Sequence, residues 1–436
     1  MIPRIHEVFS RQELRDSKKR PVVAITGIGV ITALGAGVSE NWRALIAGRS
    51  GLRRITRFPT DGLKSNVAGT VDYIVPAPAS SVSRSVAMAI EAASEAIVQA
   101  RIGSPGRFPG PLFVATPPAE LEWAHLLQLY GVNNGSGSTG YSQLLTAGRS
   151  GRWSHLRSTL RFASPAEILA VRFGTQGQPV TLCTACASGT SSIQLGMEAI
   201  RRGAAQSALC IGADGTVHPE GMIRFSLLSA LSTHNDPPEK ASRPFARDRN
   251  GFVIAEGAGA LVLENYSVAR ARGARILGIV SGCGEKADDY HRTRSRPDGT
   301  AMIGAVQNAL DDAAVEPEEI DYINAHGTGT PENDRMEHLS LRAVLGDHLD
   351  RTPISSNKSM IGHTLIAAGA VEAVFSLMTI GTGTLPPTIN HDVPDPEIKL
   401  DVVPNVKREG KVRNVLSNSF GFGGQNVCAV FAAEPQ

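Results

Sequence analysis

The segment VTLCTACASGTSSIQLGMEAI (residues 180–200) is the most informative part of the sequence, because it joins an apolar run to a helix-forming run through a tight turn. Its first residues, 180–183, have the composition of a short buried strand. Apolar side chains then recur at helical spacing from Ile193 to Ile200. Cys186 lies in the turn, beside a helix N-terminus whose dipole favours a thiolate. The segment predicts an α/β fold that presents this turn at one edge of a sheet.

Strand-like runs followed by glycine-rich loops recur in the same order in the two halves of the chain. In each half the third run precedes a helix of small residues, at 187–202 and at 364–380. This order predicts an internal duplication. Because the runs are short, continuous and rich in Val, Ile and Leu, they predict a mostly parallel sheet. The runs span residues 22–26, 112–116, 180–183 and 207–212 in the first half, and 276–280, 321–325, 353–356 and 412–418 in the second.

A polar, charged segment at 265–275 marks the boundary between these halves. We therefore predict three parts of the chain. They are an N-terminal arm or short helical lead-in over residues 1–20, a first half over 21–268 and a second half over 269–436.

The composition is that of a globular protein: 436 residues, 42% hydrophobic and 19% charged, with a net charge of +2. Such an even balance gives no field that would attract nucleic acid or an anionic membrane surface. Five cysteines are too few for a disulfide framework, which predicts a reducing compartment, the cytoplasm. The first 20 residues are charged throughout and lack the apolar centre of a secretory signal.

Two further segments have an unusual composition. Residues 361–380 are long and apolar enough to span a membrane, but they contain His363 and Glu372, so we predict a buried helix. Residues 131–140, GVNNGSGSTG, are low in complexity. Around them we expect a partly helical surface excursion that acts as a lid or an interface arm.

The glycine-rich run GIGVITALG (27–35) invites comparison with a dinucleotide-binding loop. It supplies Gly27 and Gly29, but Thr32 stands in the third glycine position and no acidic residue follows at the required distance. The run favours a tight packing turn over a cofactor site.

The cysteines allow more than one interpretation. Cys186 in its turn is either an exposed nucleophile or a buried structural cysteine. Cys183 gives it the C-x-x-C spacing of a redox pair, but Cys183 belongs to the predicted strand. The other three cysteines, Cys210, Cys283 and Cys428, lie in apolar runs and predict core positions.

Two histidines follow predicted strands of the second half, His326 in NAHGTGTP and His363 in NKSMIGH, and Lys358 accompanies the second. Because ligands bind at the carboxyl ends of parallel strands, we expect these side chains to meet Cys186 at one edge. Zinc is the alternative for a Cys/His group. We predict no metal, since the spacing repeats no ligand pattern and no cysteine pair accompanies the histidines.

The last loop, NSFGFGG (418–424), places two phenylalanines among glycines. It either offers a main-chain N–H to an oxyanion and gates an apolar channel, or forms a turn whose rings fill core.

Together these loops resemble the motifs of the β-ketoacyl-[acyl-carrier-protein] synthases, specifically the elongating synthase I/II class with a Cys-His-His site. The resemblance extends over residues 21–433. It implies a thiolase-like α/β fold in which two duplicated halves form an α-β-α-β-α layered sandwich, in a homodimer or a heterodimer with a paralogue. The matching segments are TACASG (184–189), RPFARDRNGFVIAEGAGALVLE (243–264), NAHGTGTP (324–331), NKSMIGH (357–363), GHTLIAAGAVEAV (362–374) and NSFGFGG (418–424).

The resemblance also implies roles for single residues. Cys186 would take the acyl chain from acyl carrier protein. His326 and His363 would donate hydrogen bonds to the malonyl thioester carbonyl, and Lys358 would orient and polarise the site. The remaining implied roles are an oxyanion hole of the Cys186 and Phe422 backbone N–H groups, pantetheine contacts from Thr328 and Thr330, an acyl gate at Phe422, and further substrate contacts at Phe420 and Gly423.

The implied reaction is a decarboxylative Claisen condensation that extends a fatty acyl chain by two carbons, with no metal or redox cofactor. A histidine at position 363 favours the elongating class over initiating synthases, which have Asn there, and thiolases, which use a second Cys. Alternatives are a polyketide-type or nodulation-type ketosynthase with the same site, and a non-catalytic partner subunit. The complete Cys186, His326 and His363 set argues against the latter.

Three segments depart from the family pattern. ATPPAELEW (115–123) replaces a glycine-rich segment that lines the acyl pocket, residues 76–90 lack the usual basic carrier-docking stretch, and the excursion at 119–160 is divergent. These departures predict a specialised enzyme with an unusual acyl length or a dedicated carrier protein. The family also leaves open a structural monovalent cation near Glu337 and Glu372.

Overall fold

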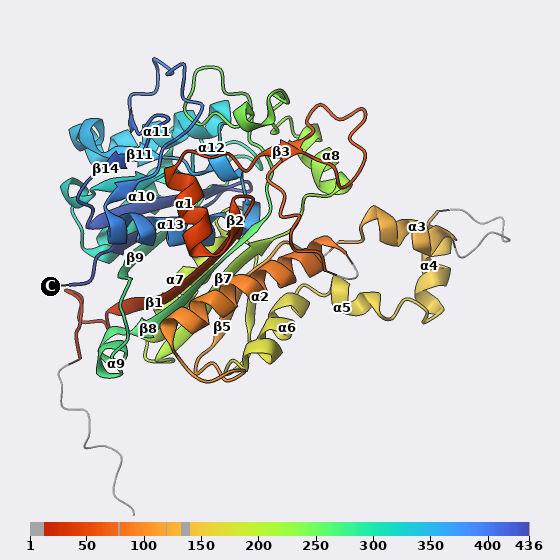
Figure 1. The fold of residues 1–436 in the computed structure, drawn as a ribbon, viewed down its shortest axis with the longest axis horizontal. Coiled ribbons are helices and arrows are strands. Elements are labelled where there is room, and N and C mark those ends of the chain that lie inside the picture. Colours follow the sequence, from red (N-terminus) through yellow and green to blue (C-terminus); the bar gives the residue numbers. More distant parts are fainter. Residues whose placement is uncertain (1–12, 77–78, 119, 132–139, 436) are drawn as a thin grey trace, which may run out of the picture.

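A computed structural model describes residues 13–76, 79–118, 120–131 and 140–435 of the chain. A mixed sheet of twelve strands, with helices on both sides, dominates these residues (Figure 1). Its order is β13-β11-β10-β15-β16-β9-β1-β8-β7-β5-β6, and β2 pairs with β1. The strands are β1 (Val23–Thr32), β2 (Gly35–Ala36), β5 (Leu112–Ala115), β6 (Val180–Leu182), β7 (Ser207–Asp214), β8 (Gly257–Asn265), β9 (Gly278–Ala287), β10 (Tyr322–Asn324), β11 (Pro353–Ser355), β13 (Asp401–Val402), β15 (Asn414–Gly421) and β16 (Gln425–Ala432).

Two small two-stranded sheets, β3-β4 and β12-β14, and the helices complete the fold. The small strands are β3 (Arg53–Arg54), β4 (Val67–Ala68), β12 (Thr384–Leu385) and β14 (Arg408–Glu409). The helices are α1 (Val38–Ile46), α2 (Ser81–Ala100), α3 (Trp123–Gly131), α4 (Tyr141–Arg149), α5 (Leu156–Leu160), α6 (Ser164–Phe173), α7 (Ser188–Arg201), α8 (Pro219–Leu227), α9 (Tyr266–Ala271), α10 (Thr300–Ala313), α11 (Pro331–Leu345), α12 (Lys358–Ile361) and α13 (Ala368–Thr382).

The strand order confirms the predicted duplication. From the centre outward, the first half runs β1-β8-β7-β5-β6 and the second runs β9-β16-β15-β10-β11. Counted without the two-residue strands, which include β2 and β13 of this sheet, the order in both halves is the first strand, then the fifth, fourth, second and third. The two halves join where β1 and β9 pair antiparallel.

The helices form layers on both sides of the two half-sheets. Helices α7 and α13 pack between the halves, and α13 contacts β7 and β8 of the first half as well as β15 of the second. Helix α2 covers the outer face of the first half, and α10, with α11 against it, covers the second. These layers agree with the expected α-β-α-β-α sandwich.

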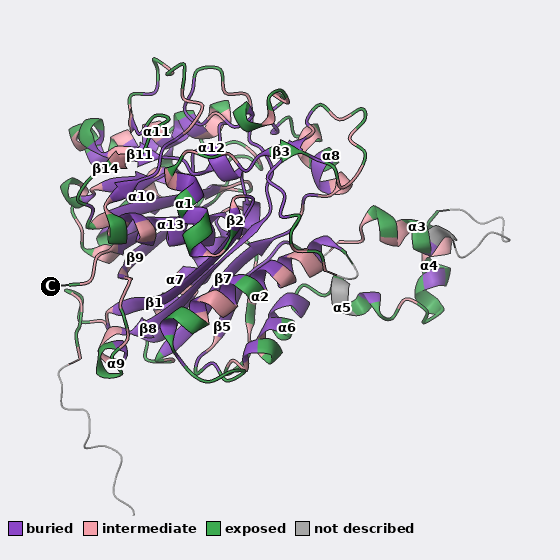
Figure 2. Cartoon of the chain, viewed as in Figure 1, coloured by how far each residue is buried: buried purple, intermediate pink, exposed green. Residues whose placement is uncertain are grey.

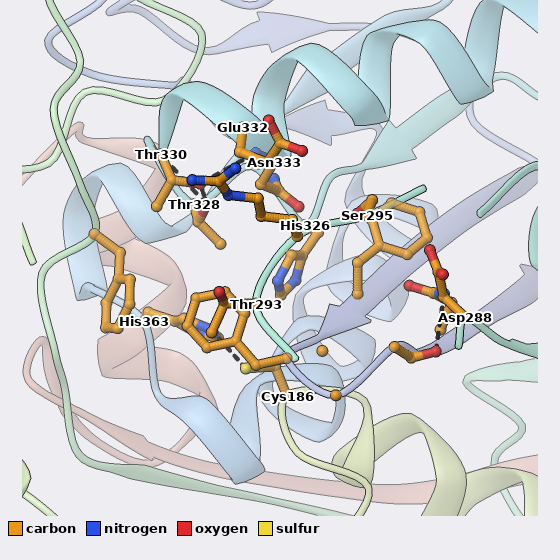
Figure 3. Close-up of a pocket in the computed structure, with 18 of the residues that line it drawn as sticks. Cys186, Asp288, Thr293, Ser295, His326, Thr328, Thr330, Glu332, Asn333 and His363 are labelled. Atoms are coloured by element: carbon orange, nitrogen blue, oxygen red, sulfur yellow. Dashed lines mark hydrogen bonds between the residues drawn. The ribbon is translucent and has the colours of Figure 1, made fainter. Parts of the chain in front are cut away.

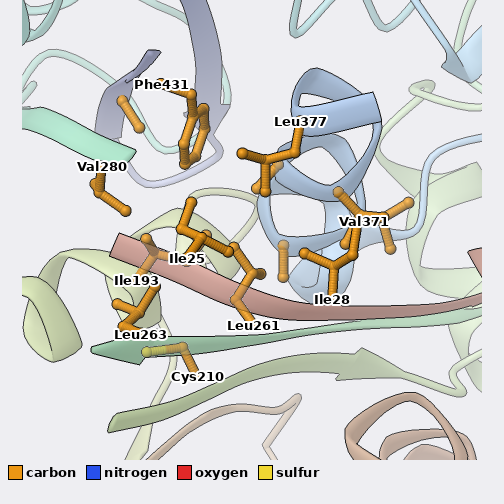
Figure 4. Close-up of a cluster of buried hydrophobic side chains, with 14 of the residues drawn as sticks. Ile25, Ile28, Ile193, Cys210, Leu261, Leu263, Val280, Val371, Leu377 and Phe431 are labelled. Atoms are coloured by element: carbon orange, nitrogen blue, oxygen red, sulfur yellow. The ribbon is translucent and has the colours of Figure 1, made fainter. Parts of the chain in front are cut away.

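The largest apolar cluster lies between the layers. Side chains of the central strands, such as Ile25 and Leu261, pack there against α7 and α13, as Figure 4 shows. Helix α13 and the turn before it, Leu365–Thr382, have the length and apolarity to cross a membrane, but 78% of this stretch is buried inside the fold. The prediction of a buried helix at this position is confirmed, and Figure 2 shows the same burial along the central strands.

The prediction of a mostly parallel sheet is wrong for its centre. The outer strands are parallel, but β8, β1, β9 and β16 pair antiparallel with one another and with their neighbours. The analysis of the sequence missed β8 and β16, the fifth strand of each half. Each returns along the fourth strand and so reverses the direction of the sheet.

The glycine runs after the first strand of each half are also strand rather than turn. A Cβ at Gly27 would lie 2.0 Å from the carbonyl oxygen of Ala96 in α2. A Cβ at Gly284 would lie 2.1 Å from the backbone nitrogen of Ala309 in α10. These glycines let a helix approach the strand closely, and the same device appears in both halves.

Two further expectations concern the chain's periphery. Helices α3, α4 and α5 extend away from the body in Figure 1, which confirms a partly helical excursion. Most of its low-complexity part, 132–139, lies outside the described residues. Of the N-terminal arm only residues 13–20 are described, and there Arg20 forms ion pairs with Asp16 and Asp312.

Candidate active site

Cys186 lies in a strained turn between β6 and α7. The residue before it, Ala185, has φ +48°, a left-handed conformation that non-glycine residues rarely adopt. Ser188 fixes this turn, because its hydroxyl donates to the Ala185 carbonyl oxygen at 2.5 Å and accepts from the Thr184 N–H at 2.7 Å. The result is a nucleophile elbow that presents Cys186 ahead of the first turn of α7.

His363 lies directly against the thiol. Its Nε2 is 3.2 Å from Cys186 Sγ, and its Nδ1 accepts the Leu365 N–H at 3.3 Å. A nitrogen that accepts a hydrogen bond carries no proton, so the ring proton of neutral His363 is on Nε2. This N–H points at the sulfur (Figure 3).

His326 is held in the same tautomer by Lys358. The Lys358 Nζ donates to the His326 carbonyl oxygen at 2.6 Å and lies 3.4 Å from His326 Nδ1. Lys358 also forms a fully buried ion pair with Glu372. The rings of His326 and His363 meet edge to face, with centroids 5.2 Å apart. Both histidines therefore carry their proton on Nε2.

Burial determines the charge of all three central groups. It lowers the pKa of His326 and of His363 well below 6.5, with the charge of Lys358 acting in the same direction, so both rings are neutral near pH 7. Burial also raises the pKa of the Cys186 thiol to about 12, although Lys358 and the Phe422 backbone amide oppose this. The resting group is thus a thiol, and the thiolate expected from the helix N-terminus is outweighed by burial.

One pocket brings the predicted residues together. Cys186, His326 and His363 line it with Thr328 and Thr330, whose hydroxyls lie 2.9 Å apart. Lys358 is the exception, since it stands behind His326 and does not line the pocket. The last loop supplies the other predicted lining residues, Phe420, Phe422 and Gly423.

The last loop approaches Cys186 through its backbone. A Cβ at Gly421 would lie 3.1 Å from the Cys186 backbone nitrogen, and the Phe422 backbone N–H lies close enough to the Cys186 sulfur to lower the pKa of the thiol. Phe422 itself packs, half-buried, with an apolar cluster that includes Phe252 and Leu365. Both amides predicted for an oxyanion hole therefore lie beside the thiol.

The sequence analysis missed a second loop of the pocket. Residues between β9 and α10, among them Asp288, Thr293 and Arg294, also line it. They were missed because the predicted strand at 276–280 ends seven residues early. The true end of β9 at Ala287 places the following polar residues in a post-strand loop, which is the signal that would have found them. Other missed lining residues are Phe225, Phe252, His291, Ser295, Glu332, Asn333, Leu365, Gly424 and Asn426.

Two sets of residues could hold an ion. The Cys186 sulfur and nitrogens of His326 and His363 lie within 4.8 Å of one another, as metal ligands would. The prediction of no metal there stays a prediction.

The acidic pair suits a different ion. Glu337 and Glu372 are both buried, and Glu372 Oε2 and Asn418 Oδ1 have no hydrogen-bond partner within the described ranges of the chain. These oxygens fit the monovalent cation that the resemblance leaves open.

A Cys-His-His site at the edge of a duplicated α/β sandwich defines a thiolase-like condensing site. Comparison with known families agrees. Residues 20–269 match the family described as beta-ketoacyl synthase, N-terminal domain, and residues 277–392 match the beta-ketoacyl synthase, C-terminal domain. The chain belongs to the β-ketoacyl synthase family.

Individual relatives fall into two named groups. The 3-oxoacyl-[acyl-carrier-protein] synthase 2 of Coxiella burnetii is 37% identical over 94% of this chain and 97% of its own length. The tetracenomycin polyketide synthase ketoacyl synthase alpha subunit of Streptomyces glaucescens is 36% identical over 96% of this chain and 98% of its own.

Solved structures show the same fold. The ishigamide ketosynthase/chain length factor matches with a TM-score of 0.82 and 35% identity, and it covers 95% of this chain and 100% of that chain. A type II polyketide synthase acyl-carrier protein in complex with its ketosynthase matches with a TM-score of 0.83 and 32% identity, with the same coverage.

Proposed function

We propose that this chain is a 3-oxoacyl-[acyl-carrier-protein] synthase, which condenses a malonyl unit with an acyl chain held on Cys186. The observation that carries the proposal is the meeting of Cys186 Sγ with His363 Nε2 at 3.2 Å, beside a second neutral histidine. A thiol nucleophile next to two N–H donors suits thioester chemistry. The family assignment supports the same reaction.

In the first step, the Cys186 sulfur attacks the acyl thioester carbonyl. A new bond forms between the Cys186 sulfur and the acyl carbon, and the bond from that carbon to the sulfur of the carrier's pantetheine arm breaks. The thiol proton of Cys186 leaves with the thiol of the pantetheine arm. The transient oxyanion would accept hydrogen bonds from the backbone N–H groups of Cys186 and Phe422, which both lie beside the sulfur.

In the second step, the malonyl group loses carbon dioxide. The electrons of the broken carbon–carbon bond move onto the thioester oxygen, and an enolate forms. The enolate oxygen accepts hydrogen bonds from the Nε2–H groups of His326 and His363. Preorganised donors of this kind contribute about 3–4 kcal/mol each. The enolate carbon then attacks the acyl–Cys186 carbonyl and expels the cysteine sulfur as a thiolate, which takes a proton from water.

The lining residues would position the pantetheine arm. Thr328 and Thr330 offer hydroxyls to its amides, Phe420 and Gly423 contact the substrate, and Phe422 gates the acyl side from the apolar cluster. The arm would belong to an acyl carrier protein, as in the names of relatives from both groups.

The same relatives support a proposal for the location and the oligomeric state of the enzyme. We propose a cytoplasmic protein that forms a homodimer, or a heterodimer as the ketosynthase/chain length factor pair does. We further propose that the halves divide at residues 268 and 269, after an arm over 1–20, because the strand order repeats from β9 onward.

The test is trapping of the acyl-enzyme. Incubation with an acyl thioester should add one acyl group to the intact mass of the wild type and none to that of Cys186→Ala. Cys183→Ala is the matched control and should be acylated like the wild type. Acylation of Cys186→Ala would contradict the proposal, because another residue would then be the nucleophile. The absence of acylation from the wild type would also contradict it and would favour a non-catalytic partner subunit.

A further inference from the structure

Arg294 is an exposed cation that lines the pocket and has no acidic partner among the residues that the structure describes. It lies in the loop between β9 and α10 and lines the same pocket as Cys186 and Thr330. Arg294 is exposed, whereas His326 and His363 are each 2% exposed, so the pocket opens toward it. Within the described part of the chain it makes no ion pair or hydrogen bond.

The two acidic residues that line the pocket, Asp288 and Glu332, already have partners. Asp288 accepts the backbone N–H groups of Tyr290 at 2.9 Å and Arg296 at 2.8 Å. Glu332 pairs with Arg335 at 3.3 Å. The next residue along the chain, Asp289, forms an ion pair with Arg296 at 3.3 Å. The positive charge of Arg294 is therefore left for a ligand.

The loop that carries Arg294 is fixed to the catalytic loop. The Gly423 N–H donates to the Arg292 carbonyl oxygen at 2.7 Å, and the Asp288 N–H donates to the Gly424 carbonyl oxygen at 2.8 Å. Arg294 is thus held two residues from a backbone contact with the loop of Phe422. A fixed backbone lowers the entropy cost of presenting its side chain to a ligand.

We propose that Arg294 binds the phosphate group of the phosphopantetheine arm. The inference rests on the proposed function, which places the arm's sulfur at Cys186 and its amides at Thr328 and Thr330. Figure 3 shows Cys186 at one end of the pocket and Thr330, Glu332 and Asn333 at the other. An arm that runs between these ends brings its phosphate to the exposed mouth. A guanidinium is the side chain best shaped for two hydrogen bonds to a phosphate.

The experiment compares two thioesters that differ only in the phosphate. The same acyl group is presented on phosphopantetheine and on pantetheine, and kcat/KM for acylation of Cys186 is followed by intact mass. Arg294→Ala should lose about tenfold with the phosphorylated thioester and nothing with pantetheine. Arg294→Lys should recover part of the loss, because a lysine keeps the charge without the paired geometry.

Arg296→Ala is the matched control, since Arg296 is in the same loop but pairs with Asp289 and does not line the pocket. It should behave as the wild type with both thioesters. An equal loss for Arg294→Ala on both thioesters, or no loss on either, would overturn the inference. Failure of the proposed function looks different, because the wild type would then be acylated by neither thioester.

Acyl-coenzyme A and acyl-carrier protein form the last pair of substrates. Both carry the phosphate, so Arg294→Ala should slow acylation from both. A loss confined to acyl-carrier protein would show that Arg294 contacts the protein surface and would overturn the phosphate assignment.

Discussion

Cys186, which is half-buried, must lose its thiol proton beside two neutral imidazoles. With a pKa of about 12 it holds that proton at neutral pH, so the thiolate forms only as the thioester is attacked. Neither histidine has a free ring nitrogen for the proton, because Leu365 and Lys358 occupy both Nδ1 atoms. In the proposed reaction the histidines would therefore act as hydrogen-bond donors, which is the role that enolate stabilisation requires.

The buried ion pair of Lys358 and Glu372 gives the first prediction at this scale. Lys358→Met should lower the free energy of unfolding by about 3–5 kcal/mol, because it leaves the Glu372 carboxylate buried without a partner. Adding Glu372→Gln should restore most of this stability. Urea unfolding measures both. Equal stability of the single and double variants would contradict the account.

The pH dependence of stability follows from the two histidines. Their pKa values lie well below 6.5 in the fold, so the unfolded chain binds more protons once the pH falls below 6.5. This part of the stability is present above pH 6.5 and is lost as the pH falls toward the folded pKa. The contribution of the two histidines to the free energy of unfolding should therefore decline as the pH falls from about 7 to 5. Buried carboxyl groups contribute with the opposite sign, because burial raises the pKa of Glu372 to about 7 and that of Asp214 to about 6. His363→Gln should decline less steeply, and identical slopes would exclude this origin.

At the scale of elements, the glycines of β1 test how closely helix α2 packs. Gly27→Ala should cost about 3 kcal/mol, because its Cβ would lie 2.0 Å from the Ala96 carbonyl oxygen, a backbone atom. Gly148→Ala is the control, since Gly148 lies in α4 with open space around it. It should be neutral or stabilising by about 1 kcal/mol. A thermal melt in which both variants match the wild type would contradict this packing.

The same elements show what the sequence could and could not predict. The turn at Cys186 and the loops of His326 and His363 were predictable, because short apolar runs followed by Gly-rich segments mark strand ends. Strand β8 was missed, since its run GAGALVLEN begins with glycines and alanines of low strand propensity. Strand β9 was cut short for the same reason, and with it the loop of Arg294. Glycines that allow close packing of a helix on a strand give the same sequence pattern as glycines in a turn, so the two cases cannot be distinguished before the position of the helix is known.

At the scale of the whole molecule, the departures from the family gather at one end of the first half. In the segment 115–123, Glu122 accepts the backbone N–H of Ser81 at 2.6 Å and its hydroxyl at 2.8 Å. This segment thus caps α2 rather than following the family's glycine pattern. We expect an acyl preference unlike that of a housekeeping synthase, which an acyl series would reveal. If the enzyme prefers the same acyl chain lengths as the fatty acid synthase of general metabolism and uses the same acyl carrier protein, the prediction of a specialised enzyme is wrong.

The edge of the sheet gives a prediction about assembly. Strand β6 ends the sheet, and Val180 on it is 38% exposed. An unpaired edge of this kind is a template for a second chain. The protein should therefore sediment at twice its chain mass of 46.0 kDa, and Val180→Lys should weaken that dimer. Val406→Lys, at a side chain 72% exposed and away from β6, should leave it intact. A monomeric wild type would contradict the proposed homodimer.

The proposed role of Cys186 can be measured in the condensation reaction itself. Malonyl-carrier protein and an acyl series from short to very long chains would be incubated with the wild type, Cys186→Ala and the control Cys183→Ala, and products read by mass. The account predicts a β-ketoacyl product two carbons longer than the acyl substrate from the wild type and the control, and none from Cys186→Ala. A product from Cys186→Ala, or none from the wild type with any chain or carrier, would contradict it.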